Sequence, residues 1–181
     1  NTCVIAVKGN FDDAQTGVKK LFTDPALAKK LADNGYCFSS ANSINIGRLT
    51  PQVVYYVWAY CRLLAEGAIK NGEAINVVVP TGNFGNILAA YYAKRMGVPF
   101  GKLICASNAN NVLTDFLSTG EYNVNREFFM TESPSMDILV SSNLERLIFE
   151  LCDKDDGYII EIMKSLREHG VYCVPDEILA R

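Results

Sequence analysis

Short apolar runs alternate with helical patterns along the chain. The runs at 2–7, 75–80 and 102–107 are rich in apolar and β-branched residues, and each has the length of a buried strand. A helical pattern follows the second and the third run and ends at a glycine, Gly97 or Gly120. This alternation is typical of βαβ units, whose strands lie parallel. The pattern therefore predicts an α/β fold with a parallel sheet flanked by helices.

The first fifty positions carry signals for two helix starts and one loop. Asp12 and Asp13 fall where acidic side chains suit the first turn of a helix in GNFDDAQTGVKKLF. Thr23-Asp24-Pro25 places a cap and then a proline at the start of a second short helix, which stops near Gly35. Residues 36–49 show no clear period, which predicts a loop with a short strand at its start.

A long helix is predicted after this loop. Thr50-Pro51 is expected to cap it, and the helical pattern extends to about Gly67 or Lys70. Because its residues are apolar nearly all round, we expect it to be buried on most sides or covered by a partner subunit. The last third of the chain predicts two further helices, at 141–152 and 155–170.

The composition suits one compact domain. The chain has 181 residues, 49% of them hydrophobic and 20% charged, so residues 1–181 are expected to form a single globular unit with a sizeable core. The net charge of −3 gives no reason to expect nucleic acid or an anionic membrane as a partner. No apolar run reaches the roughly 18 residues of a membrane span, and no signal peptide opens the chain. The abrupt start at Asn1, which leads straight into a predicted strand, suggests a cut fragment.

Cysteine and histidine usage narrows the chemistry. Most of the six cysteines lie in apolar runs and no C-x-x-C pair exists, which favours reduced core residues in a cytoplasmic protein over disulfides. The chain has one histidine, His169, so neither a histidine-based zinc site nor a Ser-His-Asp triad is expected. The sequence predicts no metal site.

The clearest chemical signal is the segment Gly82-Asn83-Phe84-Gly85-Asn86, which lies between a predicted strand and a predicted helix. Backbone N–H groups can converge there at the positive end of the helix dipole, and glycine allows close approach or positive φ. The segment therefore predicts a phosphate cradle, although a plain βα turn with glycines for tight packing looks similar. It matches neither the Walker loop nor the dinucleotide G-x-G-x-x-G.

Two other polar segments are candidates for a site. The segment 39–49 is rich in hydroxyl and amide side chains and contains Arg48, which can bind a phosphate through two parallel hydrogen bonds. A solvated loop whose polar side chains cap neighbouring backbone explains the same composition. The segment 131–138 is interpreted as a connecting loop with a turn at Pro134.

These segments together resemble threonine synthase. That family carries N-S-x-N-x-x-R, then P-T/S/V-G-N-x-G-N/D after a strand, then S-P-S/A-M-D-I/V followed by S-x-N-x-E-R. This chain has matching residues, in the same order, at 42–48, 80–86, 133–138 and 141–146, and GNFDDAQ at 9–15 is similar to the family's G-x-F-D-x-A/C-Q. The resemblance spans essentially the whole chain, and several motifs in register are more specific than any one of them.

The resemblance implies part of the large domain of a fold-type-II enzyme that uses pyridoxal 5'-phosphate (PLP). Such an enzyme converts O-phospho-L-homoserine and water to L-threonine and phosphate. The resemblance assigns the PLP phosphate to the cradle formed by 82–86, and the substrate phosphate to Asn42, Ser43 and Arg48.

The resemblance also indicates what this chain lacks. The family's Schiff-base lysine lies in an F-K-D segment near an S-G-D/N-T-G loop, and no lysine here has that context; Lys8 in AVKGNF does not match. The family's C-terminal segment, which contacts the pyridine nitrogen, is missing too. We therefore expect no catalytic residue in this chain and no activity from it alone. The alternatives are a related fold-type-II lyase acting on another phosphorylated amino acid, and a non-catalytic anion-binding α/β domain.

Overall fold

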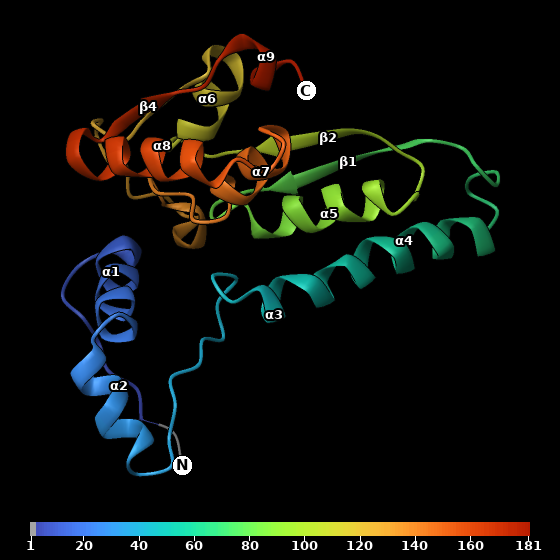
Figure 1. Cartoon of the computed structure of the whole chain (residues 1–181). Coiled ribbons are helices and arrows are strands. Elements are labelled where there is room, and N and C mark those ends of the chain that lie inside the picture. Colours follow the sequence, from blue (N-terminus) through green and yellow to red (C-terminus); the bar gives the residue numbers. More distant parts are fainter. Residues whose placement is uncertain (1–2) are drawn as a thin grey trace. The chain divides into compact units, whose positions relative to one another are not determined.

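The structure, a computed structural model, describes residues 3–181. Its contacts divide the chain into two compact units, one up to Ala41 and one from Asn42 to Arg181 (Figure 1). That both belong to one globular catalytic domain stays a prediction. Among the described residues, no helix combines the length and the apolar character needed to cross a bilayer.

The first unit contains the two predicted helices, α1 (Phe11–Phe22) and α2 (Pro25–Ala32). The start of α1 is a reciprocal cap, in which Asp13 N–H donates to Asn10 Oδ1 at 3.0 Å and Asn10 N–H donates to Asp13 Oδ2 at 2.9 Å. At α2, Asp24 accepts hydrogen bonds from two first-turn N–H groups. Both predicted helix starts are confirmed.

Two predicted strands are absent from the described part of this unit. Thr2 lies outside the described residues, and 3–7 form no strand; Val4 and Ile5 are 90% and 80% exposed. The short strand predicted at Tyr36 is missing as well. A strand requires hydrogen bonds to a neighbouring strand, and no described residue pairs with either segment, so apolar composition by itself did not produce one.

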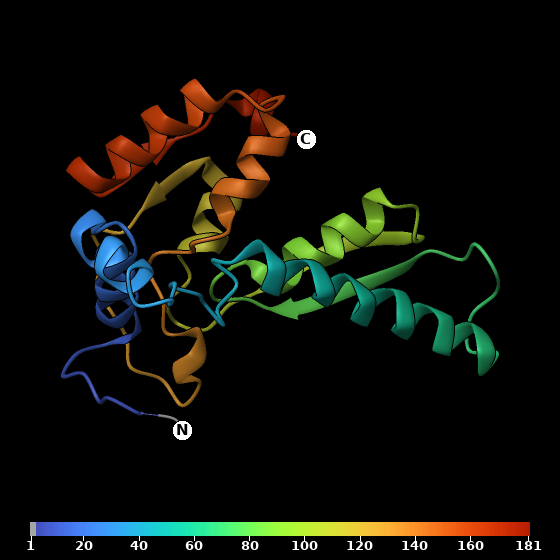
Figure 2. The same ribbon diagram turned by 60° about the horizontal axis from the view of Figure 1, so that its bottom comes forward.

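The second unit is built on a parallel pair of strands, β1 (Ile75–Pro80) and β2 (Phe100–Ala106), paired in a register that sets Val78 opposite Ile104. The helix α5 (Gly85–Arg95) connects them, and α4 (Val53–Ala65) runs beside α5 in both views (Figure 1 and Figure 2). This arrangement confirms the predicted strand–helix–strand unit and its parallel sheet.

The start and the surroundings of α4 differ from the prediction. Its chain enters through α3 (Ile46–Leu49) and the 3-10 turn η1 (Thr50–Gln52), so the Thr50 hydroxyl donates back to the Ile46 carbonyl at 3.0 Å and does not cap α4. Tyr55 and Trp58 are 65% and 63% exposed within the described chain. The helix is therefore not buried on most sides, and its coverage by a partner subunit stays a prediction.

The rest of the second unit consists of short elements around two longer helices. The helices α7 (Leu144–Leu151) and α8 (Asp156–His169) confirm the two predicted for the last third. The sequence did not predict the antiparallel pair β3 (Glu121–Asn123) and β4 (Val171–Cys173), in which Tyr122 stacks on Tyr172 with ring centroids 5.1 Å apart. The remaining elements are α6 (Val112–Thr119), the 3-10 turn η2 (Pro134–Met136) and α9 (Asp176–Leu179).

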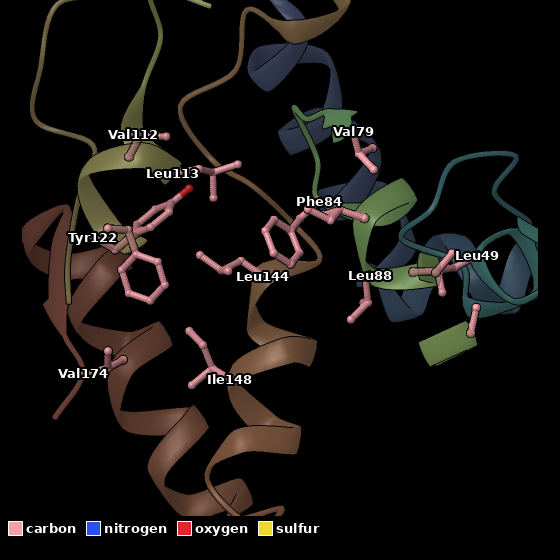
Figure 3. Packing of buried hydrophobic residues seen from close by; sticks show 14 of the residues in the cluster. Leu49, Val79, Phe84, Leu88, Val112, Leu113, Tyr122, Leu144, Ile148 and Val174 are labelled. Atoms are coloured by element: carbon pink, nitrogen blue, oxygen red, sulfur yellow. The ribbon is translucent and has the colours of Figure 1, made fainter. Parts of the chain in front are cut away.

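The hydrophobic core joins the parallel sheet region to α6, α7 and α8. Figure 3 shows Leu88, Leu113, Leu144 and Ile148 in this cluster; each is at most 3% exposed. Phe84, at the start of α5, belongs to the same cluster. The core therefore extends to the strand–helix turn for which the sequence predicts a phosphate cradle.

Most of the cysteines lie outside the core, contrary to the prediction of core residues, although Cys105 packs against the core cluster. Cys3, Cys37, Cys61 and Cys173 are exposed, and the other two are half-buried; all six are free thiols. Apolar neighbours indicate a helix or a strand, but they do not determine which face of that element a given residue occupies.

Candidate phosphate-binding site

A short loop, Thr81–Phe84, joins β1 to α5. Thr81 fixes its start, because the Thr81 N–H donates to the Ala106 carbonyl at 2.8 Å across the sheet. Phe84 has φ +62° and ψ 0°, a left-handed conformation that is strained for a bulky residue. Its side chain is 5% exposed and packs in the core cluster with Leu144 (Figure 3). Burial of the ring holds the loop in a conformation that phenylalanine otherwise disfavours.

The loop carbonyls are turned toward the segment before α7. The Ser141 hydroxyl donates to the Gly82 carbonyl, and Asn143 donates to the Asn83 carbonyl through its backbone N–H at 3.1 Å and its Nδ2 at 2.9 Å. In a trans peptide the C=O and N–H groups point in opposite directions, and the described chain has no cis peptide bond. The N–H groups of Asn83 and Phe84 therefore point away from this segment.

The loop and the first turn of α5 present a row of open donors. Within the part of the chain that the structure describes, the backbone N–H groups from Gly82 to Ile87 have no hydrogen-bond acceptor. Those of 85–87 are first-turn donors at the positive end of the helix dipole. Open donors at a helix N-terminus are the components of an anion site.

A cavity of about 440 Å³ adjoins these donors. All five residues of 82–86 line it, together with Asn42 and Ser43 from one predicted segment and Ser135 and Met136 from another. The remaining lining residues are Gln52, Pro80 and Thr81. The fold thus brings three sequence-predicted segments together. None of these lining side chains is charged, so an anion here would meet backbone dipoles and amides.

Gly82 in the loop and Gly85 at the start of α5 allow neighbouring segments to approach closely. A Cβ on Gly82 would lie 2.8 Å from Ile138 Cδ1, and a Cβ on Gly85 would lie 2.9 Å from the Ser43 side chain. The prediction that these glycines supply positive φ is wrong, because in the described loop the positive φ belongs to Phe84. Their function in the structure is close packing of 42–43 and 135–138 against the loop.

Of the three residues predicted to bind the substrate phosphate, Asn42 and Ser43 line the cavity and Arg48 does not. Asn42 Oδ1 accepts a hydrogen bond from the Ile44 N–H at 3.1 Å, which bends the chain beside the cavity. Arg48 lies in α3 with an exposed side chain and is not among the lining residues. Within residues 3–181 its guanidinium has no hydrogen-bond or ion-pair partner. The assignment of Arg48 to a substrate phosphate stays a prediction.

Comparison with known proteins gives the chain a family. No protein-family model matches it. The threonine synthase-like 1 protein of Homo sapiens is 49% identical over 183 residues, which cover 100% of this chain and 25% of that protein. The threonine synthase of Pseudomonas aeruginosa is 40% identical over 173 residues, 96% of this chain and 34% of that enzyme. The chain belongs to the threonine synthase family.

A solved structure of the family has the same fold. The crystal structure of PLP-bound threonine synthase from Brucella melitensis superposes with a TM-score of 0.79 and 43% sequence identity. The alignment covers 96% of this chain and 35% of that one. The predicted fold class is confirmed, and the chain spans about a quarter to a third of the length of its threonine synthase relatives.

In this member of the threonine synthase family, a buried carboxylate organises the segment 131–138. Asp137 accepts hydrogen bonds from the Thr131 N–H at 2.8 Å, from the Thr131 hydroxyl at 2.8 Å, and from the side-chain amides of Asn108 and Asn110. The Thr131 N–H is the main cause that lowers the pKa of Asp137 below its usual value, and burial opposes it. These bonds fix the segment that brings Ser135 and Met136 to the cavity.

No function is predicted from the sequence for Asn143 or Arg146, although both lie in the S-x-N-x-E-R motif, which is the available signal for them. In the structure Asn143 is fully buried, and the Arg146 guanidinium donates to the backbone carbonyls of Ser43 and Ile44. Partners about a hundred residues apart cannot be paired from a single sequence.

Proposed function

We propose that this chain supplies the phosphate-recognition part of a PLP-dependent threonine synthase. The complete enzyme converts O-phospho-L-homoserine and water to L-threonine and phosphate. The observation that carries the proposal is the row of open backbone N–H groups from Gly82 to Ile87 beside a cavity whose lining residues match the family motifs. The cytoplasmic location expected from the sequence belongs to the same proposal.

The cradle fits the phosphate of PLP. Gly82, Asn83, Phe84, Gly85 and Asn86 line the cavity, and their N–H groups can donate to a dianion without a cation beside it. When bound, PLP supplies an electron sink for negative charge that develops on the substrate's carbon atoms. The residues of this chain bind and orient that group through its phosphate.

The second phosphate belongs to the substrate and leaves during the reaction. We assign it to Asn42, Ser43 and Arg48, of which the first two line the same cavity. A phosphate that departs needs contacts that stabilise it as it gains charge, and an arginine supplies both charge and two parallel donors. Arg48 has no protein partner among the described residues, so its charge is available for this function.

A titration of the full-length protein tests the cradle. PLP and pyridoxal differ only in the phosphate, so PLP should bind more tightly by a factor on the order of a hundred or more, since each charge-assisted hydrogen bond contributes about 1.5–3 kcal/mol. Absorbance of the cofactor reports both dissociation constants. Equal affinity for PLP and pyridoxal would show that the cradle does not bind a phosphate.

We further propose that residues 1–181 are inactive by themselves, because none of their lysines lies in the family's F-K-D context. Borohydride reduction in the presence of PLP, followed by peptide mapping, tests this. In the full-length protein a single lysine outside this chain should carry the cofactor. Stoichiometric labelling of one lysine within residues 1–181 would contradict the assignment.

One observation favours a second candidate, a related PLP lyase that acts on another phosphorylated amino acid. The chain is 49% identical to a protein named threonine synthase-like 1, and 40% identical to a protein named threonine synthase. The two candidates share the cradle and differ in the substrate. Steady-state rates of the full-length protein on a panel of phosphorylated amino acids, O-phospho-L-homoserine among them, distinguish the two.

A further inference from the structure

The two proposed phosphate subsites share one cavity, so the segments that form them need a fixed separation. Side-chain hydrogen bonds from Asn143 and Arg146 join these two segments. We propose that Arg146, acting through Asn143, is a positioning residue that holds the substrate-phosphate segment at 42–44 against the cofactor-phosphate loop at 82–86. We call these two residues the Asn143–Arg146 clamp. The inference rests on the proposed function, because it concerns the spacing of the two subsites assigned there.

Arg146 is committed to the backbone of the substrate segment. Its Nη1 donates to the Ser43 carbonyl at 2.9 Å and its Nη2 donates to the Ile44 carbonyl at 2.6 Å. Nη1 also donates to Asn143 Oδ1. Arg146 does not line the cavity, and it forms no ion pair with an acidic side chain among the described residues. Its planar fork therefore binds two consecutive peptide carbonyls, and it is not placed as a ligand of either phosphate.

Asn143 extends the connection to the cofactor loop. Its side chain is fully buried, and its Nδ2 donates both to Ser43 Oγ at 2.9 Å and to the Asn83 carbonyl at 2.9 Å. One amide group thus contacts both phosphate segments. Ser43 also packs closely against the start of α5, because a Cβ on Gly85 would lie 2.9 Å from the Ser43 side chain.

The two segments depend unequally on Arg146. The cofactor loop keeps bonds that do not involve Arg146, since the Ser141 hydroxyl holds the Gly82 carbonyl and the Asn143 N–H holds the Asn83 carbonyl. The segment at 42–44 has its Ser43 and Ile44 carbonyls held by Arg146. Loss of the guanidinium should therefore displace the substrate subsite and leave the PLP subsite in place.

The experiment compares binding of PLP with binding of inorganic phosphate to the full-length, PLP-loaded protein. Once PLP fills the cradle, added phosphate reports the second subsite, and calorimetry or the cofactor's absorbance gives its dissociation constant. Arg146→Ala should weaken phosphate binding about tenfold, the effect of losing hydrogen bonds to a charged donor. PLP affinity should stay within about twofold, and Arg146→Lys should restore part of the loss, because a point charge cannot bind both carbonyls in the same way. Arg167→Ala, which removes a charge from the last turn of α8, is the matched control and should change neither constant.

The outcomes separate the clamp from the proposed function. If the unaltered protein binds neither PLP nor phosphate, both proposals are overturned. If it binds both and Arg146→Ala keeps the original phosphate affinity, the clamp alone is overturned. A parallel loss of PLP affinity, phosphate affinity and thermal stability would also overturn it, because Arg146 would then support the fold and not the spacing. Should Arg146→Ala fail to fold, the same comparison is made with Arg146→Lys.

Discussion

Replacement of Asn86 by proline removes one of the open donors without removing an intrahelical hydrogen bond. Asn86 is the second residue of α5, where the N–H has no helical acceptor, and Gly85 before it has no Cβ to collide with the proline ring. The Asn86 carbonyl, which accepts from the Tyr56 hydroxyl at 2.8 Å, is retained in the variant. The substitution is therefore close to the deletion of a single N–H group.

The expected magnitude follows from the charge of the ligand. One hydrogen bond from an N–H to a phosphate contributes about 1.5–3 kcal/mol. Its loss should therefore raise the dissociation constant of PLP about tenfold to hundredfold. Asn86→Ala is the matched control, because it removes the side chain and keeps the N–H. Pyridoxal is the matched ligand, because it lacks the phosphate.

The assay is titration of PLP and of pyridoxal into the full-length apoprotein, followed by cofactor absorbance. Asn86→Pro should weaken PLP binding and leave pyridoxal binding unchanged, and Asn86→Ala should lose clearly less PLP affinity. An equal loss in both variants would assign the effect to the side chain. An equal loss for both ligands would mean that proline disturbed the whole cavity, and unchanged PLP binding would refute the backbone cradle.

Two further predictions concern side chains. Arg48→Ala in the full-length enzyme should lower kcat/KM for O-phospho-L-homoserine about tenfold to hundredfold with normal PLP content, and Arg48→Lys should recover part of it; an unchanged kcat/KM would remove Arg48 from the site. Because hydrogen bonds lower the pKa of Asp137, its carboxylate stabilises the fold above the usual aspartate pKa of about 3.9, and this stabilisation is lost as the pH falls through the lowered value. Asp137→Asn should therefore have a lower melting temperature than the unaltered protein at pH 6, and its melting temperature should fall less between pH 6 and pH 3. The exposed control Asp176→Asn should have the melting temperature of the unaltered protein at both pH values.

The sequence was sufficient to predict those helices and strands whose structure is determined by their own local residues. Acidic first-turn residues located α1, a cap with its proline located α2, terminal glycines located the ends of α5 and α6, and uninterrupted apolar runs located β1 and β2. It failed where the outcome depends on a partner. The strand expected at 3–7 has no described neighbour, and the apolar α4 has one face against α5 and another exposed. The strands β3 and β4 have three residues each, which is too short for an alternating pattern to be recognised.

The candidate site shows the same division. Gly82, Asn83, Gly85, Asn86 and Ser43 were predicted from local residue types and from the resemblance, and all five line the cavity. Phe84 was predicted as part of the cradle, but its left-handed conformation was not, because a bulky residue rarely adopts that conformation and the local sequence does not reveal the core contact that enforces it. The functions of Asn143 and Arg146 were also missed, because their hydrogen bonds join segments 60 to 103 residues apart.

The buried ring of Phe84 has a consequence for the entropy of ligand binding. A flexible glycine-rich loop loses backbone freedom when it closes on an anion, at about 1–2 kcal/mol for each residue that becomes fixed. Here the ring is inserted in the core beside Leu144, so the loop is already ordered when the core forms. The ligand then meets donors that are aligned in advance, and more of the interaction energy is retained as affinity. At the proposed phosphate site, Phe84 is therefore expected to strengthen anion binding through the packing of its ring, although the ring itself donates no hydrogen bond to the anion.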